Sequence, residues 1–318
     1  MMAAARAVKV GVVLPSREAV IAGHADPGLL IEVAERAERA GFDSVWTGDS
    51  LFHRPRFDPL AMLAAVAART ERVEIGTAVL IASQRHPLLL AQTVATLDRI
   101  ANGRLVLGVG AGWIPLEFEA LGVPFGERVG RLRDTIAICR ALWRGETPPG
   151  SRYWQLPALE LLPKPKQPGG PPIWMGGSGP QALRNAGRHC DGWMPTSPTP
   201  EAFAAGWREV RRHAEQAGRD PDSIDTGAYL TIHLTDDLAA GEKESAAYAQ
   251  AYYGIPYEVM RKGQAYFVGD VPACLSWLGE FVRAGVRHLM LRFATTEPLP
   301  QLERARELLP GLAGTARA

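Results

Sequence analysis

The sequence predicts an α/β protein of the (β/α)8 barrel class, with loop and helix insertions at the mouth formed by the carboxyl ends of the strands. Short apolar, β-branched runs recur along the 318 residues, and amphipathic stretches follow most of them, which is the pattern of parallel βαβ units. Eight such runs favour a closed barrel over the alternative, an open doubly wound sheet. No linker divides the chain, so we expect one domain over residues 1–318.

The first half of the chain alternates regularly. The run at 8–14 (VKVGVVL) predicts the first strand rather than a signal peptide, because no long apolar core accompanies its basic residues. The stretch that follows has apolar residues at helical spacing and ends at Gly41, a common helix stop. Further strands are expected at 44–47, 73–80 and 104–109, and helices at 29–40, 59–69, 87–100, 115–121 and 128–143.

The second half continues the alternation with two longer insertions. The segment 145–172 holds eight prolines and predicts an ordered, irregular excursion. The segment 240–269 predicts additional helix and loop before the last unit. Strands are expected at 173–175, 191–194, 225–234 and 287–293, and helices at 180–188, 200–217, 241–253 and 301–309.

Composition excludes several classes of function. The chain has 35 basic and 34 acidic residues and a net charge of +1, which argues against nucleic-acid or membrane-surface binding. No stretch approaches the roughly 20 apolar residues that span a bilayer. The three cysteines lie far apart, which favours buried thiols in a reducing compartment. We therefore expect a cytoplasmic protein that binds neither nucleic acid nor membrane.

Reactive groups of such barrels lie where strands end. Asp49 lies just beyond the second predicted strand, so it is a candidate functional carboxylate, although an Asp that caps a turn is an equal alternative. Arg54, Arg56 and Arg85 belong to loops at the predicted mouth. They favour an anionic cofactor modestly, while simple solvation of the rim is the alternative.

Two glycine-rich turns follow later strands. The run Gly108–Trp113 has the spacing G-x-G-x-G, which is not the dinucleotide fingerprint, but its glycines allow close approach of a flat or anionic ligand. The run Gly176–Gly179 leads into a helix that begins at Pro180. Free N–H groups at a helix start bind anions, so this turn predicts a phosphate site, with a plain connecting turn as the alternative.

Protein side chains alone supply little chemistry. The seven histidines form no H-x-H or H-E-x-x-H pair, so we expect no metal site. The sequence has no G-x-S-x-G nucleophile elbow either. This scarcity of catalytic side-chain motifs favours chemistry carried out by a bound cofactor.

The ordered motifs resemble a known family. They cover nearly the whole chain and are specific through their order and spacing: 40–46 (AGFDSVW) with Asp49, 76–79 (GTAV), 85–87 (RHP), 95–98 (ATLD), 102–104 (NGR), 108–113 (GVGAGW), 117–118 (EF), 121–122 (LG), 171–173 (PPI) with 176–177 (GG), Ala186 with 191–193 (DGW), and 284–286 (AGV). Together they are similar to the bacterial luciferase-like superfamily of flavin- and deazaflavin-dependent oxidoreductases, and most of all to the branch that uses coenzyme F420.

The resemblance implies a (β/α)8 barrel with the tricyclic ring of the cofactor at its mouth. It implies a cis peptide at Ala78–Val79 that supports one ring face, a phosphate held by 177–179, and Asp49 near the ring or its chain. The full cofactor-binding set that it implies is Asp49, Ala78, Val79, Gly110, Ala111, Gly112, Gly176, Gly177, Ser178 and Gly179.

One departure concerns proton transfer. In related sugar-phosphate and alcohol dehydrogenases a histidine follows the second-strand acid, but here the residue is Ser50, and Trp113 replaces a second acid. We place Ser50 and Trp113 in the substrate pocket, with residues 252–257 as further walls, and take Asp49 and His53 as catalytic candidates. Either His53 substitutes for the missing histidine, or solvent supplies the proton in a reduction.

The leading hypothesis is an F420-dependent oxidoreductase that exchanges hydride with a small organic substrate. The first alternative is an FMN-dependent two-component monooxygenase that receives reduced flavin from a separate reductase. The second is a barrel that binds a cofactor without turnover. We also expect a homodimer.

Overall fold

The structure, a computed structural model, is a closed parallel barrel of eight strands and describes residues 8–23, 25–197 and 199–313, so part of the predicted domain 1–318 lies outside the described residues. The strands follow the chain around the barrel, and the last one pairs with both the first and the one before it in the ring. They are β1 (Lys9–Val13), β2 (Ser44–Thr47), β3 (Glu74–Thr77), β5 (Leu105–Gly110), β6 (Ile173–Gly176), β7 (Gly192–Met194), β8 (Asp225–Leu234) and β10 (His288–Phe293).

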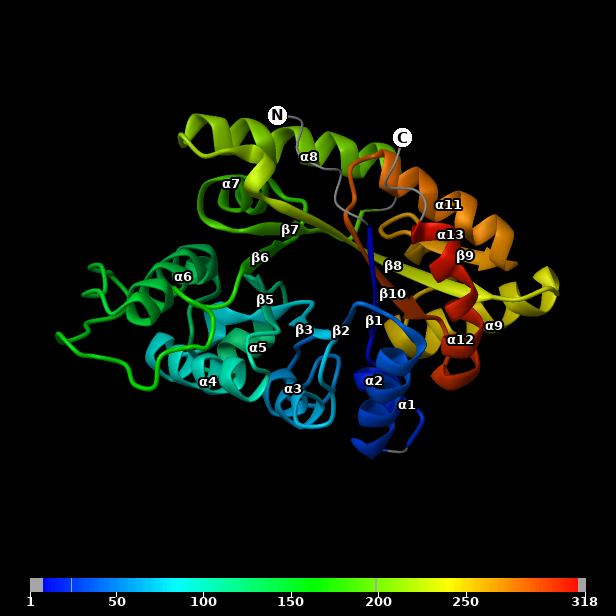
Figure 1. The fold of residues 1–318 in the computed structure, drawn as a ribbon, viewed down its shortest axis with the longest axis horizontal. Coiled ribbons are helices and arrows are strands. Elements are labelled where there is room, and N and C mark those ends of the chain that lie inside the picture. The colour runs from blue at the N-terminus through cyan, green and yellow to red at the C-terminus, as the bar shows by residue number, and fades with distance from the viewer. Residues whose placement is uncertain (1–7, 24, 198, 314–318) are drawn as a thin grey trace.

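Helices surround the strands (Figure 1). Many begin at a proline in the first turn, where the missing N–H costs nothing, and Asp58, Thr199 and Asp270 cap three of them. The main helices are α2 (Gly28–Ala40), α3 (Pro59–Ala67), α4 (Pro87–Ile100), α5 (Pro115–Ala120), α6 (Arg128–Arg144), α7 (Pro180–His189), α8 (Pro200–Gln216), α9 (Leu238–Tyr253), α11 (Val271–Arg283) and α12 (Pro298–Ala305). The (β/α)8 prediction is confirmed.

Several local predictions need correction. The predicted strand 73–80 divides into β3 and a short β4 (Leu80–Ile81), because the cis peptide Ala78–Val79 that the resemblance implied lies between them. The insertion 240–269 contains α10 (Tyr257–Met260) and also a strand, β9 (Tyr266–Gly269), which pairs with the end of β8. Helices α1 (Ser16–Ile21) and α11 were not predicted. The excursion 145–172 is irregular, as predicted, and extends beside α6 (Figure 1).

Two tryptophans fill the barrel interior. The rings of Trp46 and Trp174 lie 5.7 Å apart, and both are buried. Glycine makes room for them, because a Cβ at Gly76 would stand 2.2 Å from the Trp46 ring. Trp46 Nε1 donates to Ser44 Oγ at 2.7 Å, and that oxygen lies 2.6 Å from His288 Nε2. Burial lowers the pKa of His288 to about 3, so this histidine is a neutral member of the core.

Candidate functional site

A cavity of about 470 Å³ opens at the carboxyl ends of the strands, within the range of roughly 300–1,000 Å³ typical of ligand sites. One side is made by residues on or just after β2, β3, β5, β7, β8 and β10, and the other by residues 252–264, which run from the end of α9 to the loop after α10. The position is where enzymes of this barrel class hold their reacting groups.

The structure brings part of the predicted site together. Asp49, Ala78, Val79, Gly112 and Trp113 all line this cavity, although they come from three separate strand ends. The predicted walls Tyr252, Tyr253 and Ile255 line it too. The other predicted residues are not among its lining: Ser50, His53, Gly110, Ala111, Gly176, Gly177, Ser178 and Gly179.

Val79 is wedged between two glycines. A Cβ at Gly176 would stand 2.6 Å from Val79 Cγ1, and one at Gly110 would stand 2.7 Å from Val79 Cγ2. These distances leave no room for a side chain at either position. Gly110 and Gly176 therefore act through Val79, by letting its side chain settle at the end of the barrel, rather than by facing the cavity themselves.

Asp49 is held in place by its neighbours. Its carboxylate Oδ2 accepts hydrogen bonds from the Ile81 N–H at 3.1 Å and from Arg85 Nη2 at 3.2 Å. Arg85 also pairs with Asp58 at 2.9 Å. Arg85, predicted in a mouth loop where it would favour an anionic cofactor or solvate the rim, is instead paired with two carboxylates. Asp49 anchors β4 beside the Ala78–Val79 peptide.

Ser50 and the loop after it are fastened to a buried carboxylate. Ser50 Oγ donates to Glu117 Oε1 at 2.7 Å, and the N–H groups of Phe52 and His53 donate to the same oxygen at 3.3 and 3.2 Å. Burial alone would raise the pKa of Glu117, but these hydrogen bonds outweigh it and lower the pKa below its usual value. The His53 ring is exposed and meets Trp113 edge-on at 5.8 Å.

We expect Glu117→Gln to lower the free energy of unfolding at pH 7 by about 2 kcal/mol, since hydrogen bonds to charged groups contribute roughly 1.5–3 kcal/mol. A lowered pKa in the folded state stabilises above the unfolded-state value, about 4.3, and this contribution is lost as the pH falls through the folded value. The difference from wild type in denaturant titrations should therefore shrink as the pH falls below about 4.3 and through the lower, folded-state value. The exposed Glu119→Gln, on the same helix, should change little. A pH-independent difference would contradict the assignment.

Arg292 is the cavity residue that the sequence reading missed. It lies on β10, is only 2% exposed, and donates from Nη2 to Thr231 Oγ1 at 2.7 Å. Its Cζ lies 4.6 Å from the ring centroid of Tyr252 and 5.2 Å from that of Tyr253. The available signal was an arginine inside an apolar strand, which seldom occurs without a purpose in the fold or the site.

The predicted phosphate turn lies outside the cavity lining. Gly177, Ser178 and Gly179 are exposed, and Gly179 is the residue before the ten-residue helix α7. No side chain caps this helix start. A Cβ at Gly179 would have no atom within 4 Å, so the turn is open to a ligand. Its carbonyl at Gly177 is fixed by Trp193 Nε1 at 2.9 Å.

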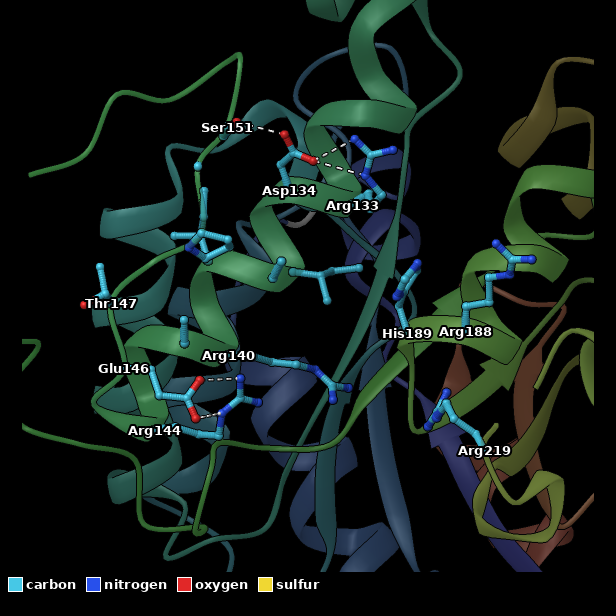
Figure 2. A pocket seen from close by; sticks show the side chains of 16 residues that line it. Arg133, Asp134, Arg140, Arg144, Glu146, Thr147, Ser151, Arg188, His189 and Arg219 are labelled. Atoms are coloured by element: carbon cyan, nitrogen blue, oxygen red, sulfur yellow. Dashed lines mark hydrogen bonds and ion pairs between the residues drawn. The ribbon is translucent and has the colours of Figure 1, made fainter. Parts of the chain in front are cut away.

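A second cavity, of about 550 Å³, lies on the flank of the barrel between α6, the loop after it and the end of α7 (Figure 2). Arg133 pairs with Asp134 and Arg144 with Glu146. Figure 2 shows Arg188, His189 and Arg219 across from them. The cavity is remote from the strand ends that carry the predicted site, so it is not the candidate active site.

In 8–23, 25–197 and 199–313, no three or more His, Cys, Asp or Glu side chains are grouped to hold a metal ion. Within the same ranges, no helix has the length and apolar character needed to cross a membrane. The three cysteines are buried and unbonded to one another.

The fold and the cavity at its mouth define a (β/α)8 barrel enzyme. Residues 8–288 match the model of a protein family described as "Luciferase-like monooxygenase". The chain belongs to this luciferase-like family, as the resemblance predicted.

Named relatives add detail. An F420-dependent glucose-6-phosphate dehydrogenase of Beutenbergia cavernae is 32% identical over 92% of this chain and 95% of its own length. Another, of Amycolatopsis mediterranei, is 39% identical, but the match spans only 54% of each protein. An F420-dependent secondary alcohol dehydrogenase, solved with an F420-acetone adduct, superposes with a TM-score of 0.82 at 21% identity, over 96% of this chain and 99% of that one. The last likeness shows the fold alone.

Proposed function

We propose that the protein is an F420-dependent oxidoreductase that transfers hydride between the deazaflavin and a small organic substrate at the mouth of the barrel. The observation that carries this proposal is the convergence of Asp49, Ala78, Val79, Gly112 and Trp113 on one cavity. The F420-dependent dehydrogenases among its relatives support the deazaflavin over FMN.

The cavity suits a flat ring. Val79 and Ile81 offer an apolar surface, and Trp113 and the tyrosines offer aromatic ones. Ala78, Val79 and Gly112 would contact the ring, and the open turn 177–179 would take the phosphate. A bound deazaflavin supplies a two-electron hydride donor or acceptor.

The chain's own groups fix the shape of the cavity and do not themselves transfer protons. Asp49 is committed to the Ile81 N–H and to Arg85, so it fixes the wall beside the ring. In the described part of the chain, the cavity lining holds no histidine. We therefore propose that water supplies or accepts the substrate proton, the second of the two routes expected from the sequence.

The proposal is tested by titrating the purified protein with F420 and, separately, with FMN, while following the visible absorbance of each cofactor. We expect saturable binding of F420 and much weaker binding of FMN. Loaded protein is then mixed with glucose-6-phosphate, a secondary alcohol and other small substrates. Tight binding of FMN alone, or oxygen uptake with reduced FMN, would select the monooxygenase instead. Binding without turnover on any substrate would favour the non-catalytic alternative.

We expect Ser178→Asp to weaken F420 binding at least tenfold, because a carboxylate near a phosphate at this helix start repels it. Ser178→Asn, of similar size but neutral, should bind nearly as well as wild type. Both affinities are measured by the same titration. Equal affinity of the Asp and Asn variants would show that the phosphate lies elsewhere.

A homodimer and a cytoplasmic location stay predictions from the sequence.

A further inference from the structure

The cavity carries positive charge that the protein balances only in part. Arg54, Arg56 and Arg292 line it, and in the described part of the chain none of the three forms an ion pair with a carboxylate. Asp49 is the one carboxylate among the described lining residues, and Arg85 already neutralises it. Glu18 lies outside the lining, accepts a hydrogen bond from the Tyr248 hydroxyl at 2.5 Å and acts electrostatically on Arg56. Three guanidinium groups thus converge on one small space without a directly paired carboxylate.

Tyrosines, not carboxylates, surround Arg292. Four ring centroids lie within 5.7 Å of its Cζ, those of Tyr229, Tyr248, Tyr252 and Tyr253. Burial raises the pKa of Tyr229, Tyr248 and Tyr253, although the Arg292 charge opposes it. These phenols are therefore neutral at pH 7, and their ring faces stabilise the cation without cancelling its charge.

Arg292 also keeps an unused donor. Its Nε is buried and has no hydrogen-bond partner. A buried guanidinium normally uses its donors on a carboxylate or phosphate, and a buried donor left unpaired is costly. Arg292 nonetheless lines the cavity, so an anionic group bound there would meet its guanidinium.

We propose that this cavity recognises an anionic substrate, a small organic molecule whose carboxylate or phosphate group is bound by Arg292 with help from Arg54 and Arg56. The inference rests on the proposed function, since it assigns the substrate class of the same site. The proposed function assigns the cofactor's own phosphate to the separate turn 177–179 and not to these arginines. The aromatic walls would hold the uncharged part of the substrate.

The test measures binding of inorganic phosphate and of acetate by calorimetry, with ionic strength held constant by chloride, to protein with and without F420. We expect saturable binding of at least one anion beside bound F420. Arg292→Met should weaken it at least tenfold, and Arg292→Lys should restore part of the loss. The matched control Arg261→Met removes an exposed arginine that stacks on Tyr257, and should bind as wild type does.

The outcomes separate this inference from the proposed function. Failure to bind F420 would overturn the function, whatever the anions do. F420 binding with no saturable anion site, or an Arg292→Met variant that binds anions normally, would overturn the inference alone. Anions that compete with F420 would assign Arg292 to the cofactor and also overturn it. If Arg292→Met does not fold, Arg54→Met carries the same comparison, with an expected severalfold loss. Preference for phosphate or for acetate identifies the substrate's charged group.

Discussion

Trp46→Ala is expected to remove about 3–5 kcal/mol from the free energy of unfolding, the usual cost of truncating a buried tryptophan to alanine. Trp46 is fully buried at the barrel centre, and the strand beside it has glycine where any larger residue would collide with the indole. The strands cannot close over the void, because their hydrogen bonds fix the barrel radius.

Chemical denaturation monitored by far-ultraviolet circular dichroism measures this effect. Trp113→Ala is the matched control, since this indole is 61% exposed at the cavity rim and its loss should cost less than about 1 kcal/mol. A loss below about 1.5 kcal/mol in Trp46→Ala would mean that the barrel interior collapses around the change.

Gly176→Ala is expected to weaken F420 binding at least tenfold and to destabilise the fold by about 1–3 kcal/mol, the usual cost of overpacking. The new Cβ would stand 2.6 Å from Val79 Cγ1, so Val79 must move into the cavity that it lines. Gly126→Ala is the control, because a Cβ there meets no atom within 4 Å.

A double variant makes the test specific. Val79→Ala removes the methyl groups that collide with the new Cβ, so it should relieve the destabilisation caused by Gly176→Ala. The expected coupling in a double-mutant cycle is at least about 1 kcal/mol, within the range for residues in contact. Simple additivity of the two changes would contradict the expected collision between a Cβ at position 176 and the Val79 side chain.

The local signals of the sequence predicted most of the fold. Strands 44–47 and 225–234 and helix 87–100 have the predicted bounds, because apolar runs, prolines in first turns and glycines at ends are encoded within a few residues. Strand β9 escaped prediction, since it exists by pairing with the end of β8. The break at Ala78–Val79 was expected only from the family resemblance.

The site was predictable only in part, because some of its contacts join residues far apart in the sequence. Residues that follow strand ends, such as Asp49 and Trp113, are brought to the mouth by the barrel itself. The contact of Glu117 with Ser50 joins positions 67 residues apart, and Arg292 gains its surroundings from tyrosines of β8 and α9. Neither arrangement leaves a local pattern in the sequence.

The insertion after β8 supplies one wall of the cavity from a single stretch of the chain. Tyr252, Tyr253, Ile255, Met260 and Gln264 all come from this one stretch, and they face the cavity without belonging to a barrel strand. The aromatic wall of the cavity is thus encoded apart from the barrel strands, while Arg292 belongs to β10. Exchanging residues 252–264 would therefore alter this wall while leaving the strands that close the barrel intact.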